Sequence, residues 1–309
     1  MNLPAGKQET PNEQQITGRL APTPSGYLHL GNAVNFVLTW LLVRQAGGTL
    51  HLRIDDLDRA RLRQAYLGNI FEVINWLKVE YDYGPSGPDD FLRHHSQLLH
   101  LPAYNYALRR LALPGAAPPP GLLYGSPRSR TGGATAPVPL ATPGVAWRAR
   151  VPAGTTISWA DGGQGAVNVS LAAEMPDFVV RKKDGVVAYQ LASVVDDLRL
   201  GTTLIVRGHD LLPSTAAQLW LAGQVSDLKD FNQNTIQLFH HGLLTDATGQ
   251  KLSKATQAAG ETGILRHSAG PAVVYQAVAR LLGLPSGAGE SLATLQAALP
   301  ESPTAYRRL

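Results

Sequence analysis

The chain has 309 residues, contains no cysteine and has 27 Lys and Arg against 23 Asp and Glu, a formal net charge of +4. The lack of cysteine excludes disulfides, thiolate metal ligands and a cysteine nucleophile. A hydrophobic content of 44% is typical of a globular protein, and the longest mostly apolar run, residues 33–43, is shorter than the ~20 residues of a transmembrane helix. The polar N-terminus lacks the apolar stretch of a signal peptide. We therefore expect a cytoplasmic protein without membrane association. The mild positive charge permits an RNA partner, but it is also common in enzymes that bind no RNA.

The first part of the chain alternates between strand and helix patterns. Polar residues 1–15 have no periodicity and predict a flexible terminus. The elements expected next are a strand at 16–21, a buried helix at 29–46, a strand at 49–54 and a helix with an apolar face from Leu67 to Leu77. This order favours an α/β fold with a parallel sheet and crossover helices.

The middle of the chain differs in composition. Residues 113–151 are rich in Pro and Gly and show no period, so they predict an insertion formed largely of loops. Strands are then expected at 147–151, 155–159, 178–181, 203–206 and 235–244, and helices at 188–198, 213–225, 263–282 and 291–299.

The segment 21–32 predicts a nucleotide site. A strand ends, a Pro/Gly turn follows, and the next helix opens with His29-Leu30-Gly31-Asn32. A helix N-terminus offers free N–H groups and a partial positive charge to phosphates. Gly31 allows a base or ribose to approach the backbone, and His29 and Asn32 lie one turn apart, where both can face a phosphate. The alternative is a buried structural histidine.

A second candidate for phosphate binding is the loop 249–255. Lys251 and Lys254 are three residues apart and suit a polyphosphate whose charge grows as pyrophosphate leaves. Taken alone, two lysines fit a solvated basic loop equally well.

Together the two motifs resemble the H-x-G-H and K-M-S-K-S signatures of the class I aminoacyl-tRNA synthetases, in the same order. Four further segments resemble the glutamyl branch of that family: residues 19–26 (RLAPTPSG), 53–58 (RIDDLD), 189–197 (YQLASVVDD) and 206–215 (VRGHDLLPST). The resemblance spans residues 19–255. It implies a Rossmann-like class I catalytic domain with a parallel sheet, an inserted acceptor-type subdomain and a helical C-terminal part.

The length of the chain indicates which group within the glutamyl branch it resembles. About 55 residues follow Lys254, too few for the helical anticodon-binding region of full glutamyl-tRNA synthetases. In this respect the chain resembles the glutamyl-Q tRNA(Asp) synthetases, which esterify glutamate to the queuosine base at the wobble position of tRNA(Asp). The expected organisation, without an anticodon-binding domain, is a flexible N-terminus (1–15), the first half of the catalytic domain (16–112), a Pro/Gly-rich inserted subdomain (113–185), the second half with the KLSKA loop (186–260) and a helical C-terminal part (261–309).

The resemblance implies a two-step reaction. A glutamate carboxylate attacks the α-phosphate of ATP, and an acceptor hydroxyl then attacks the mixed anhydride. The residues implied for catalysis are His29, Asn32 and Lys254, and those implied for ATP are His29, Gly31, Asn32, Lys251, Ser253 and Lys254. The expected partners are L-glutamate, ATP with Mg²⁺ and queuosine-bearing tRNA(Asp), and the protein is expected to be a monomer.

The glutamate site implied by the resemblance consists of Arg19, Ala21, Thr23, Asp55, Tyr189 and Arg207. The carboxylate of Asp55 suits the substrate ammonium, and an arginine fork at position 19 or 207 suits the side-chain carboxylate. An internal ion pair between Arg207 and Asp210 is the alternative. Asp196 and Asp197 also fit a structural pair at a helix end, so they are left outside the predicted site.

Two departures from the family pattern concern the active site. Asp55 stands where glutamate is usual and is one methylene shorter, so it reaches the ammonium through a water or a backbone shift, or binds it more weakly. Ala255 ends the second signature, where the main chain matters more than the side chain.

Three other functions stay open at this point. The glutamyl group of the adenylate could go to another tRNA or a small amine. The chain could also be an inactive RNA-binding paralogue, an interpretation that Asp55 favours and that the joint presence of His29, Lys254 and Arg207 opposes. A plain nucleotidylyltransferase with a related first signature would explain neither residues 53–58 nor residues 206–215.

We predict that the protein contains no structural zinc. Family members commonly have Y-x-C-x-C-S-R where this chain has residues 124–130, with Ser126 and Arg128 at the thiolate positions. An arginine side chain does not ligate zinc. Metal analysis of the purified protein is expected to find no stoichiometric zinc, and one zinc per chain would contradict this interpretation.

Overall fold

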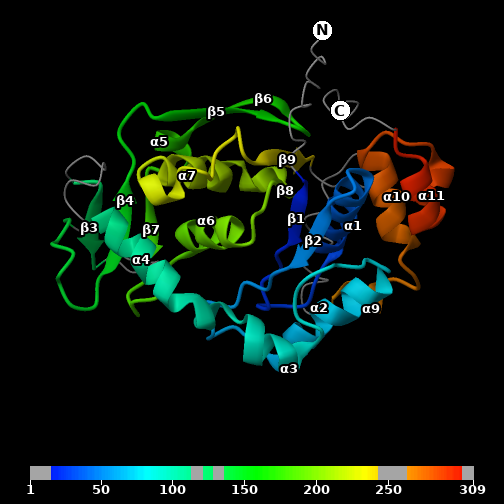
Figure 1. Cartoon of the computed structure of the whole chain (residues 1–309), viewed down its shortest axis with the longest axis horizontal. Coiled ribbons are helices and arrows are strands. Elements are labelled where there is room, and N and C mark those ends of the chain that lie inside the picture. Colours follow the sequence, from blue (N-terminus) through cyan, green and yellow to red (C-terminus); the bar gives the residue numbers. More distant parts are fainter. Residues whose placement is uncertain (1–14, 113–120, 128–135, 243–262, 301–309) are drawn as a thin grey trace, which may run out of the picture.

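A four-stranded parallel sheet lies at the centre of the computed structural model (Figure 1). The structure describes residues 15–112, 121–127, 136–242 and 263–300. The sheet has the order β2-β1-β8-β9, and its strands are β1 (Thr17–Leu20), β2 (Thr49–Leu52), β8 (Leu204–Gly208) and β9 (Gln237–His241). Every neighbouring pair is parallel. The predicted α/β fold with a parallel sheet is therefore confirmed.

The strands are connected by crossover helices, which lie on both sides of the sheet. Helix α1 (Leu30–Gln45) leads from β1 to β2, and α7 (Leu212–Ala222) leads from β8 to β9. Helix α1 is buried on nearly every face because the strands cover one side and α10 (Ala272–Leu281) covers another. It is followed by Gly47 at a positive φ of 61°, a conformation that favours glycine after a helix.

Alternate residues of the central strands face two hydrophobic cores. Leu204 and Val206 of β8 pack with α1, α10, α2 (Gln64–Trp76) and α11 (Leu292–Ala297), whereas Ile205 faces the core that contains α7. This division follows from the two-residue repeat of a strand. Both faces of β8 are covered, so its first three residues, Leu204 to Val206, are all apolar and buried.

The second core also contains α4 (Leu101–Ala112), α6 (Tyr189–Arg199) and a small antiparallel sheet. That sheet has the order β3-β4-β7 and consists of β3 (Leu123–Ser126), β4 (Ala146–Arg150) and β7 (Asp177–Arg181). The expectation that residues 113–151 are largely loops is thus wrong for β3, whose short LYGS sequence shows no alternation. The domain boundaries at 113 and 186 remain proposals.

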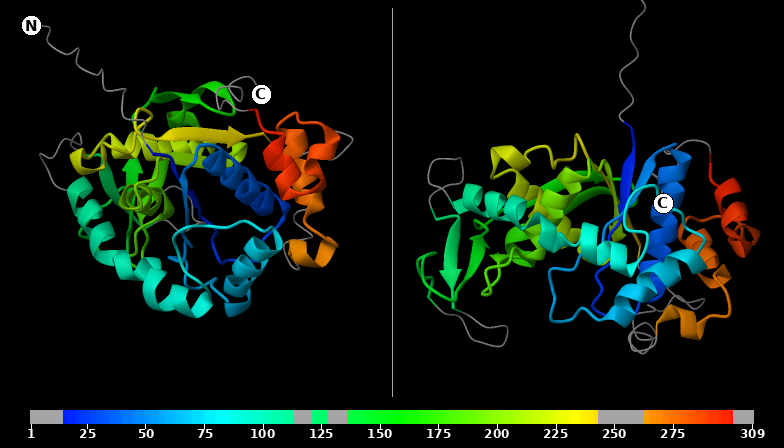
Figure 2. Two further views of the ribbon diagram at one scale, coloured as in Figure 1. Left: turned by 45° about the vertical axis from the view of Figure 1, so that its right-hand side comes forward. Right: turned by 60° about the horizontal axis from the view of Figure 1, so that its bottom comes forward.

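A hairpin extends from this region back to the central sheet. It consists of β5 (Thr156–Asp161) and β6 (Gly165–Ser170), and the Gly162 N–H donates to the Leu238 carbonyl of β9 at 2.7 Å. Figures 1 and 2 show the hairpin beside β9. The region of the expected insertion therefore contacts β9, the edge strand of the central sheet.

The remaining elements are short. They are α3 (Pro88–Asp90), the π-helix η1 (Phe91–His95), η2 (Gln97–His100), α5 (Leu171–Glu174), η3 (His209–Leu211), η4 (Ser226–Leu228), α9 (Ile264–His267) and η5 (Ser286–Glu290). The single helix expected at 263–282 is instead α9 and α10, because Pro271 caps the start of α10.

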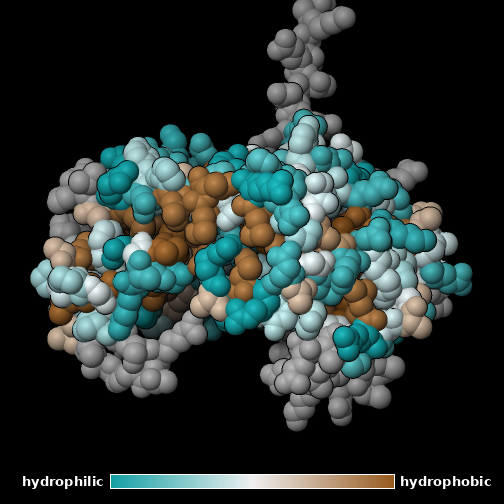
Figure 3. All heavy atoms as spheres, turned by 90° about the horizontal axis from the view of Figure 1, so that it is seen from below, coloured by the Kyte–Doolittle hydropathy of each residue, from teal (hydrophilic) through white to brown (hydrophobic). Residues whose placement is uncertain are grey.

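Apolar side chains also reach the surface. On the face drawn in Figure 3 they form patches bordered by hydrophilic side chains. Large exposed apolar residues of the described chain include Tyr83, Leu99 and Tyr106. Over the part of the chain that the structure describes, no helix has both the length and the apolar character needed to cross a bilayer.

The contact between hairpin and sheet predicts different effects for two glycine substitutions. A Cβ added to Gly163 would lie 2.3 Å from the His240 carbonyl oxygen, whereas one added to Gly68 in α2 meets no atom within 4 Å. Gly163→Ala is expected to lower the free energy of unfolding by about 1–3 kcal/mol. The control, Gly68→Ala, is expected to raise it by about 0.4–1 kcal/mol. Denaturant unfolding of both variants measures the effects, and an unchanged stability for Gly163→Ala would contradict the close packing.

Candidate active site

The carboxyl ends of the central strands surround a cavity of about 460 Å³. Its wall includes Ala21, Asp55, Gly208 and His241, which follow or end β1, β2, β8 and β9. Strands β1 and β8 are neighbours, yet the helices that follow them pack into opposite cores. Open α/β sheets bind ligands at such a switch point.

Most of the sequence-predicted residues meet in this cavity. It is lined by Arg19, Ala21, His29, Gly31, Asn32, Asp55, Tyr189 and Arg207. Thr23 instead lines a second cavity of about 930 Å³, which shares Asp55 and Tyr189 with the first. Lys251, Ser253 and Lys254 lie outside the described residues. The roles assigned to all these side chains remain predictions.

His29 and Asn32 shape the N-terminus of α1. The His29 Nδ1 accepts a hydrogen bond from the Gly31 N–H at 3.1 Å, and the Asn32 Oδ1 accepts from the His29 N–H at 3.1 Å. This reciprocal arrangement is a capping box. Burial lowers the pKa of His29, although Asp210 opposes the shift. Because Nδ1 is an acceptor, we assign the proton of the neutral ring to Nε2. His29 thus has both the structural role and a position in the cavity wall.

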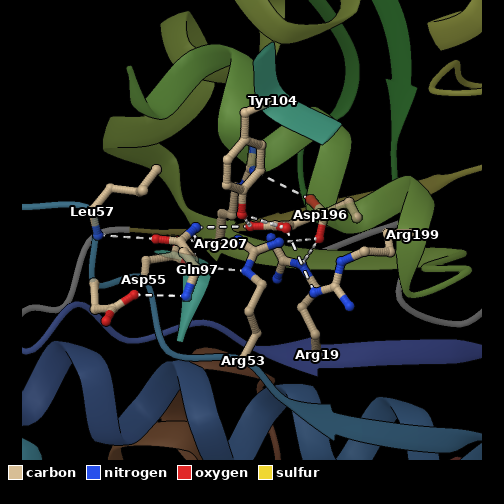
Figure 4. Close-up of polar contacts among 11 residues, drawn as sticks. Arg19, Arg53, Asp55, Leu57, Gln97, Tyr104, Asp196, Arg199 and Arg207 are labelled. Atoms are coloured by element: carbon tan, nitrogen blue, oxygen red, sulfur yellow. Dashed lines mark hydrogen bonds and ion pairs between the residues drawn. The ribbon is translucent and has the colours of Figure 1, made fainter. Parts of the chain in front are cut away.

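One buried carboxylate, that of Asp197 in α6, holds three arginines that come from separate strands. Its Oδ1 lies 2.9 Å from Arg19 Nε and 2.7 Å from Arg53 Nη1, and its Oδ2 lies 3.9 Å from Arg207 Nη2. The three arginine side chains converge in Figure 4. Burial acts to raise the pKa of Asp197, but the three guanidinium groups outweigh it and lower the pKa. Asp197 is therefore ionised and fixes the arginines.

Arg53 also pairs with Asp55. Its Nε donates to Asp55 Oδ1 at 2.7 Å, and its Nη2 donates to Oδ2 at 3.1 Å. Burial acts to lower the pKa of Arg53, but the two carboxylates of Asp55 and Asp197 raise it. Burial raises the pKa of Asp55 against the effect of Arg53. Each carboxylate oxygen retains a further lone pair for a ligand.

The neighbouring Asp196 has a structural role. It accepts from the Tyr104 hydroxyl at 2.8 Å and from Gln97 Nε2 at 2.8 Å, and it lies 3.6 Å from Arg199 (Figure 4). These bonds connect α6 to α4 and η2. The two adjacent aspartates, which from sequence also fit a structural pair, thus have different partners: of the two, only Asp197 contacts the arginine cluster.

The guanidinium group of Arg207 has one nitrogen without a hydrogen bond among the described residues. Its Nη1 donates to Thr215 Oγ1 at 3.0 Å and to Gln218 Oε1 at 2.7 Å, whereas its buried Nη2 donates to no atom in that part of the chain. Within the described residues its ion pair is with Asp197, so the alternative pairing with Asp210 is wrong. The charged groups of the cluster are Arg19, Arg53 and Arg207 against Asp55 and Asp197. This cluster has one excess positive charge and can accept one carboxylate.

Sequence reasoning missed three residues of the site. Arg53 lies in a motif that was recognised, but no role was given to it. Asp197 was set aside as structural. His241 had no sequence signal: it ends β9, its buried Nε2 has no hydrogen-bond partner within the described ranges, and burial lowers its pKa.

The described residues contain no group of three or more His, Asp or Glu side chains placed to hold a metal ion. Ser126, at a position where relatives have a zinc thiolate, is buried in β3 opposite Ala146 of β4. Arg128 lies outside the described residues. The zinc expectation stays a prediction.

Comparison with known proteins places the chain in a class. Residues 15–106 and 143–301 match the family of class I tRNA synthetases (E and Q), catalytic domain. The solved glutamate-tRNA synthetase from Elizabethkingia anophelis matches 93% of this chain with a TM-score of 0.71 and 20% identity, and this chain spans 66% of it. The fold and the sequence therefore define a class I aminoacyl-tRNA-synthetase-like ligase.

Similar sequences define the family more narrowly. A glutamyl-Q tRNA(Asp) synthetase from Nitratidesulfovibrio vulgaris is 38% identical over 279 residues, covering 83% of each chain. Another, from Burkholderia cenocepacia, is 34% identical over 308 residues, covering 94% of this chain and 96% of the relative. The chain belongs to the glutamyl-Q tRNA(Asp) synthetase family.

The arginine cluster predicts a large effect for Asp197→Asn. The amide has the same shape but leaves three buried guanidinium groups without their shared anion, so the free energy of unfolding is expected to fall by about 3–5 kcal/mol. The control, Asp58→Asn, removes a half-exposed partner of Arg61 and is expected to change stability by less than about 1 kcal/mol.

The stability difference between the wild type and Asp197→Asn is expected to depend on pH. The folded-state pKa of Asp197 is lowered, so its stabilising effect is fully present above the ordinary carboxyl pKa of about 4 and is lost as the pH falls through the lower folded value. Urea unfolding of the wild type and of Asp197→Asn, repeated from neutral to acid pH, measures how far their free energies of unfolding converge. Equal stability of the wild type and Asp197→Asn at neutral pH would contradict the role of the carboxylate.

Proposed function

We propose that this protein activates L-glutamate with ATP to glutamyl-adenylate and transfers the glutamyl group to the queuosine base at the wobble position of tRNA(Asp). The observation that supports glutamate binding most directly is the buried, unpartnered Nη2 of Arg207 in a cluster with excess positive charge. A substrate carboxylate would provide the missing acceptor. Family membership supports the choice of acceptor.

Two arginines can bind one carboxylate of glutamate. Arg19 uses Nε for Asp197 and has its terminal nitrogens left for a ligand, while Arg207 has Nη2. Charge-assisted bonds from two guanidinium groups favour a carboxylate over an amide. Asp55 lies on the same cavity wall and can accept from the substrate ammonium, and Tyr189 adds a hydroxyl there.

ATP is proposed to bind at the N-terminus of α1. The His29 Nε2–H and the helix N–H groups suit its phosphates, and Mg²⁺ accompanies the nucleotide as part of the substrate. Lys251, Ser253 and Lys254 of the second signature would bind the leaving pyrophosphate. In the first step, the α-carboxylate of glutamate forms a bond to the α-phosphorus and the bond to pyrophosphate breaks, while the arginines hold the side-chain carboxylate. The protein provides no nucleophile, so catalysis depends on positioning and on stabilising phosphate charge.

The second cavity supports an RNA acceptor. It adjoins the first at Asp55 and Tyr189, and its wall contains Arg61, Arg148, Lys182 and Lys183 together with Asp58 and Asp184. Arg61 pairs with Asp58 and Lys182 with Asp184, whereas Arg148 and Lys183 have no carboxylate partner among the described residues. Two cations without a carboxylate partner beside the anhydride suit a nucleotide with its phosphates better than a small amine. The acceptor hydroxyl would attack the carbonyl carbon there, releasing AMP.

The first experiment is glutamate-dependent ATP–pyrophosphate exchange. Exchange with glutamate but not with aspartate or glutamine is expected, without tRNA or, failing that, with queuosine-bearing tRNA(Asp). Mass spectrometry of tRNA nucleosides from a deletion strain then tests the acceptor. Glutamyl-queuosine that persists unchanged in that strain would disprove the proposed transfer.

Lys254→Ala is expected to reduce pyrophosphate exchange by at least about 100-fold, because the growing charge on pyrophosphate loses its cation. Circular dichroism is expected to show an intact fold. Lys229→Ala, directly after the short helix η4, removes a lysine outside the proposed site and is expected to leave exchange unchanged. Normal turnover by Lys254→Ala would refute the ATP assignment.

A further inference from the structure

A buried chain of hydrogen bonds leads from the β5–β6 hairpin to Arg207. Asp161 Oδ2 lies 2.5 Å from His240 Nδ1, His240 Nε2 lies 2.8 Å from Thr215 Oγ1, and Thr215 Oγ1 lies 3.0 Å from Arg207 Nη1. These side chains are almost completely buried: Asp161 is 3% exposed, and His240 and Thr215 are 0% exposed. The reaction proposed above gives no role to Asp161, His240 or Thr215.

The direction of these hydrogen bonds follows from the charge on Asp161. Its Oδ1 accepts from the N–H groups of Gly163, Gln164 and His240, and its Oδ2 accepts from Trp159 Nε1. Burial acts to raise the pKa of Asp161, but these donors and His240 outweigh it and lower the pKa. Asp161 is therefore an acceptor at every contact, and His240 Nδ1 must donate to it.

The other end of the chain is fixed by Arg207, which can only donate. Thr215 Oγ1 accepts from Arg207, so its own hydrogen is available for His240 Nε2. That nitrogen accepts when the ring is neutral, and burial does lower the pKa of His240, although Asp161 opposes the shift. Every donor and acceptor between Asp161 and Arg207 is then used.

We propose that Asp161, His240 and Thr215 are positioning residues that orient the Arg207 guanidinium for the glutamate carboxylate. The inference rests on the proposed function, in which Arg207 binds that carboxylate. Arg207 Nη2 lies 3.9 Å from Oδ2 of its ion-pair partner Asp197, which is too far for a hydrogen bond. The bonds to Thr215 and Gln218 therefore hold Nη1, and with it the orientation of a guanidinium group whose residue lines the cavity. The β5–β6 hairpin thus sets the affinity for the amino acid.

Thr215→Val tests the positioning role, because it keeps the shape of the side chain and removes its hydroxyl. In the exchange assay we expect the KM for glutamate to rise about tenfold, while the KM for ATP and kcat change by less than about twofold. Thr215→Ser restores the hydroxyl and is expected to restore the KM. Ser158→Ala is the control, because it removes an exposed bond to Asn168 in the same hairpin, and wild-type constants are expected.

A general loss of structure would move the constants for both substrates together. Equal increases in both KM values, or an unchanged KM for glutamate in Thr215→Val, would overturn the proposal. A wild-type protein that shows no exchange with glutamate, with or without tRNA, would instead refute the proposed function.

A second measurement does not depend on activity or on a variant. Nitrogen-15 NMR of the wild-type protein at neutral pH is expected to show a neutral His240 ring protonated on Nδ1. A ring protonated on Nε2 alone, or a charged imidazolium, would reverse or break the bond to Thr215 and overturn the proposed chain of contacts.

Discussion

The ionised Asp197 carboxylate is the constraint on which the rest of the site depends. Arg19 and Arg53 would repel each other in a buried space, but both lie within 3 Å of the same Asp197 oxygen. Their positions at the ends of neighbouring strands bring the guanidinium groups together, and α6 inserts the anion between them. The same arrangement leaves one positive charge unmatched at the cavity, which is the basis of the proposal that an anionic substrate group binds there.

The two hydrophobic cores explain why this cluster can be rigid. One core fixes α1 against β1 and β2, and the other fixes α6 and α7 against β8 and β9. The cavity lies at the line where these two packed layers meet. The His29 cap at the start of α1 is thus held by one core, and Arg207 with its partners on α7 by the other. The proposed sites for phosphate and for the amino acid line one cavity because the helices that follow β1 and β8 pack on opposite sides of the sheet.

The sequence predicted those parts of the site that lie in local motifs. The helix-opening segment 29–32 and the residues Arg19, Asp55 and Arg207 meet in one cavity, because Arg19 and Arg207 lie near the carboxyl ends of β1 and β8 and the other residues lie in the connections that follow β1 and β2. The role of Asp197 was not predictable in this way. Two adjacent aspartates in a helix have the same local pattern, and only the tertiary structure turns one toward Arg19 and the other toward Tyr104.

The same limit applied to β6 and to α4, which no strong local signal marked, and to the pairing of β5, a strand expected from the sequence at 155–159. Their importance depends on contacts between residues far apart in the sequence. Asp161 and His240 are separated by 79 positions, and Asp196 and Tyr104 by 92.

The ion pair between Arg19 and Asp197 joins residues 178 positions apart, and this separation has a consequence for protein synthesis. The cavity wall also needs His241 at the end of β9. A nascent chain that has left the ribosome only as far as β8 therefore lacks one wall of the cavity and the partner of Asp161. Because contacts this distant form late in folding, a nascent chain is expected to complete the cavity only after β9 has been synthesised.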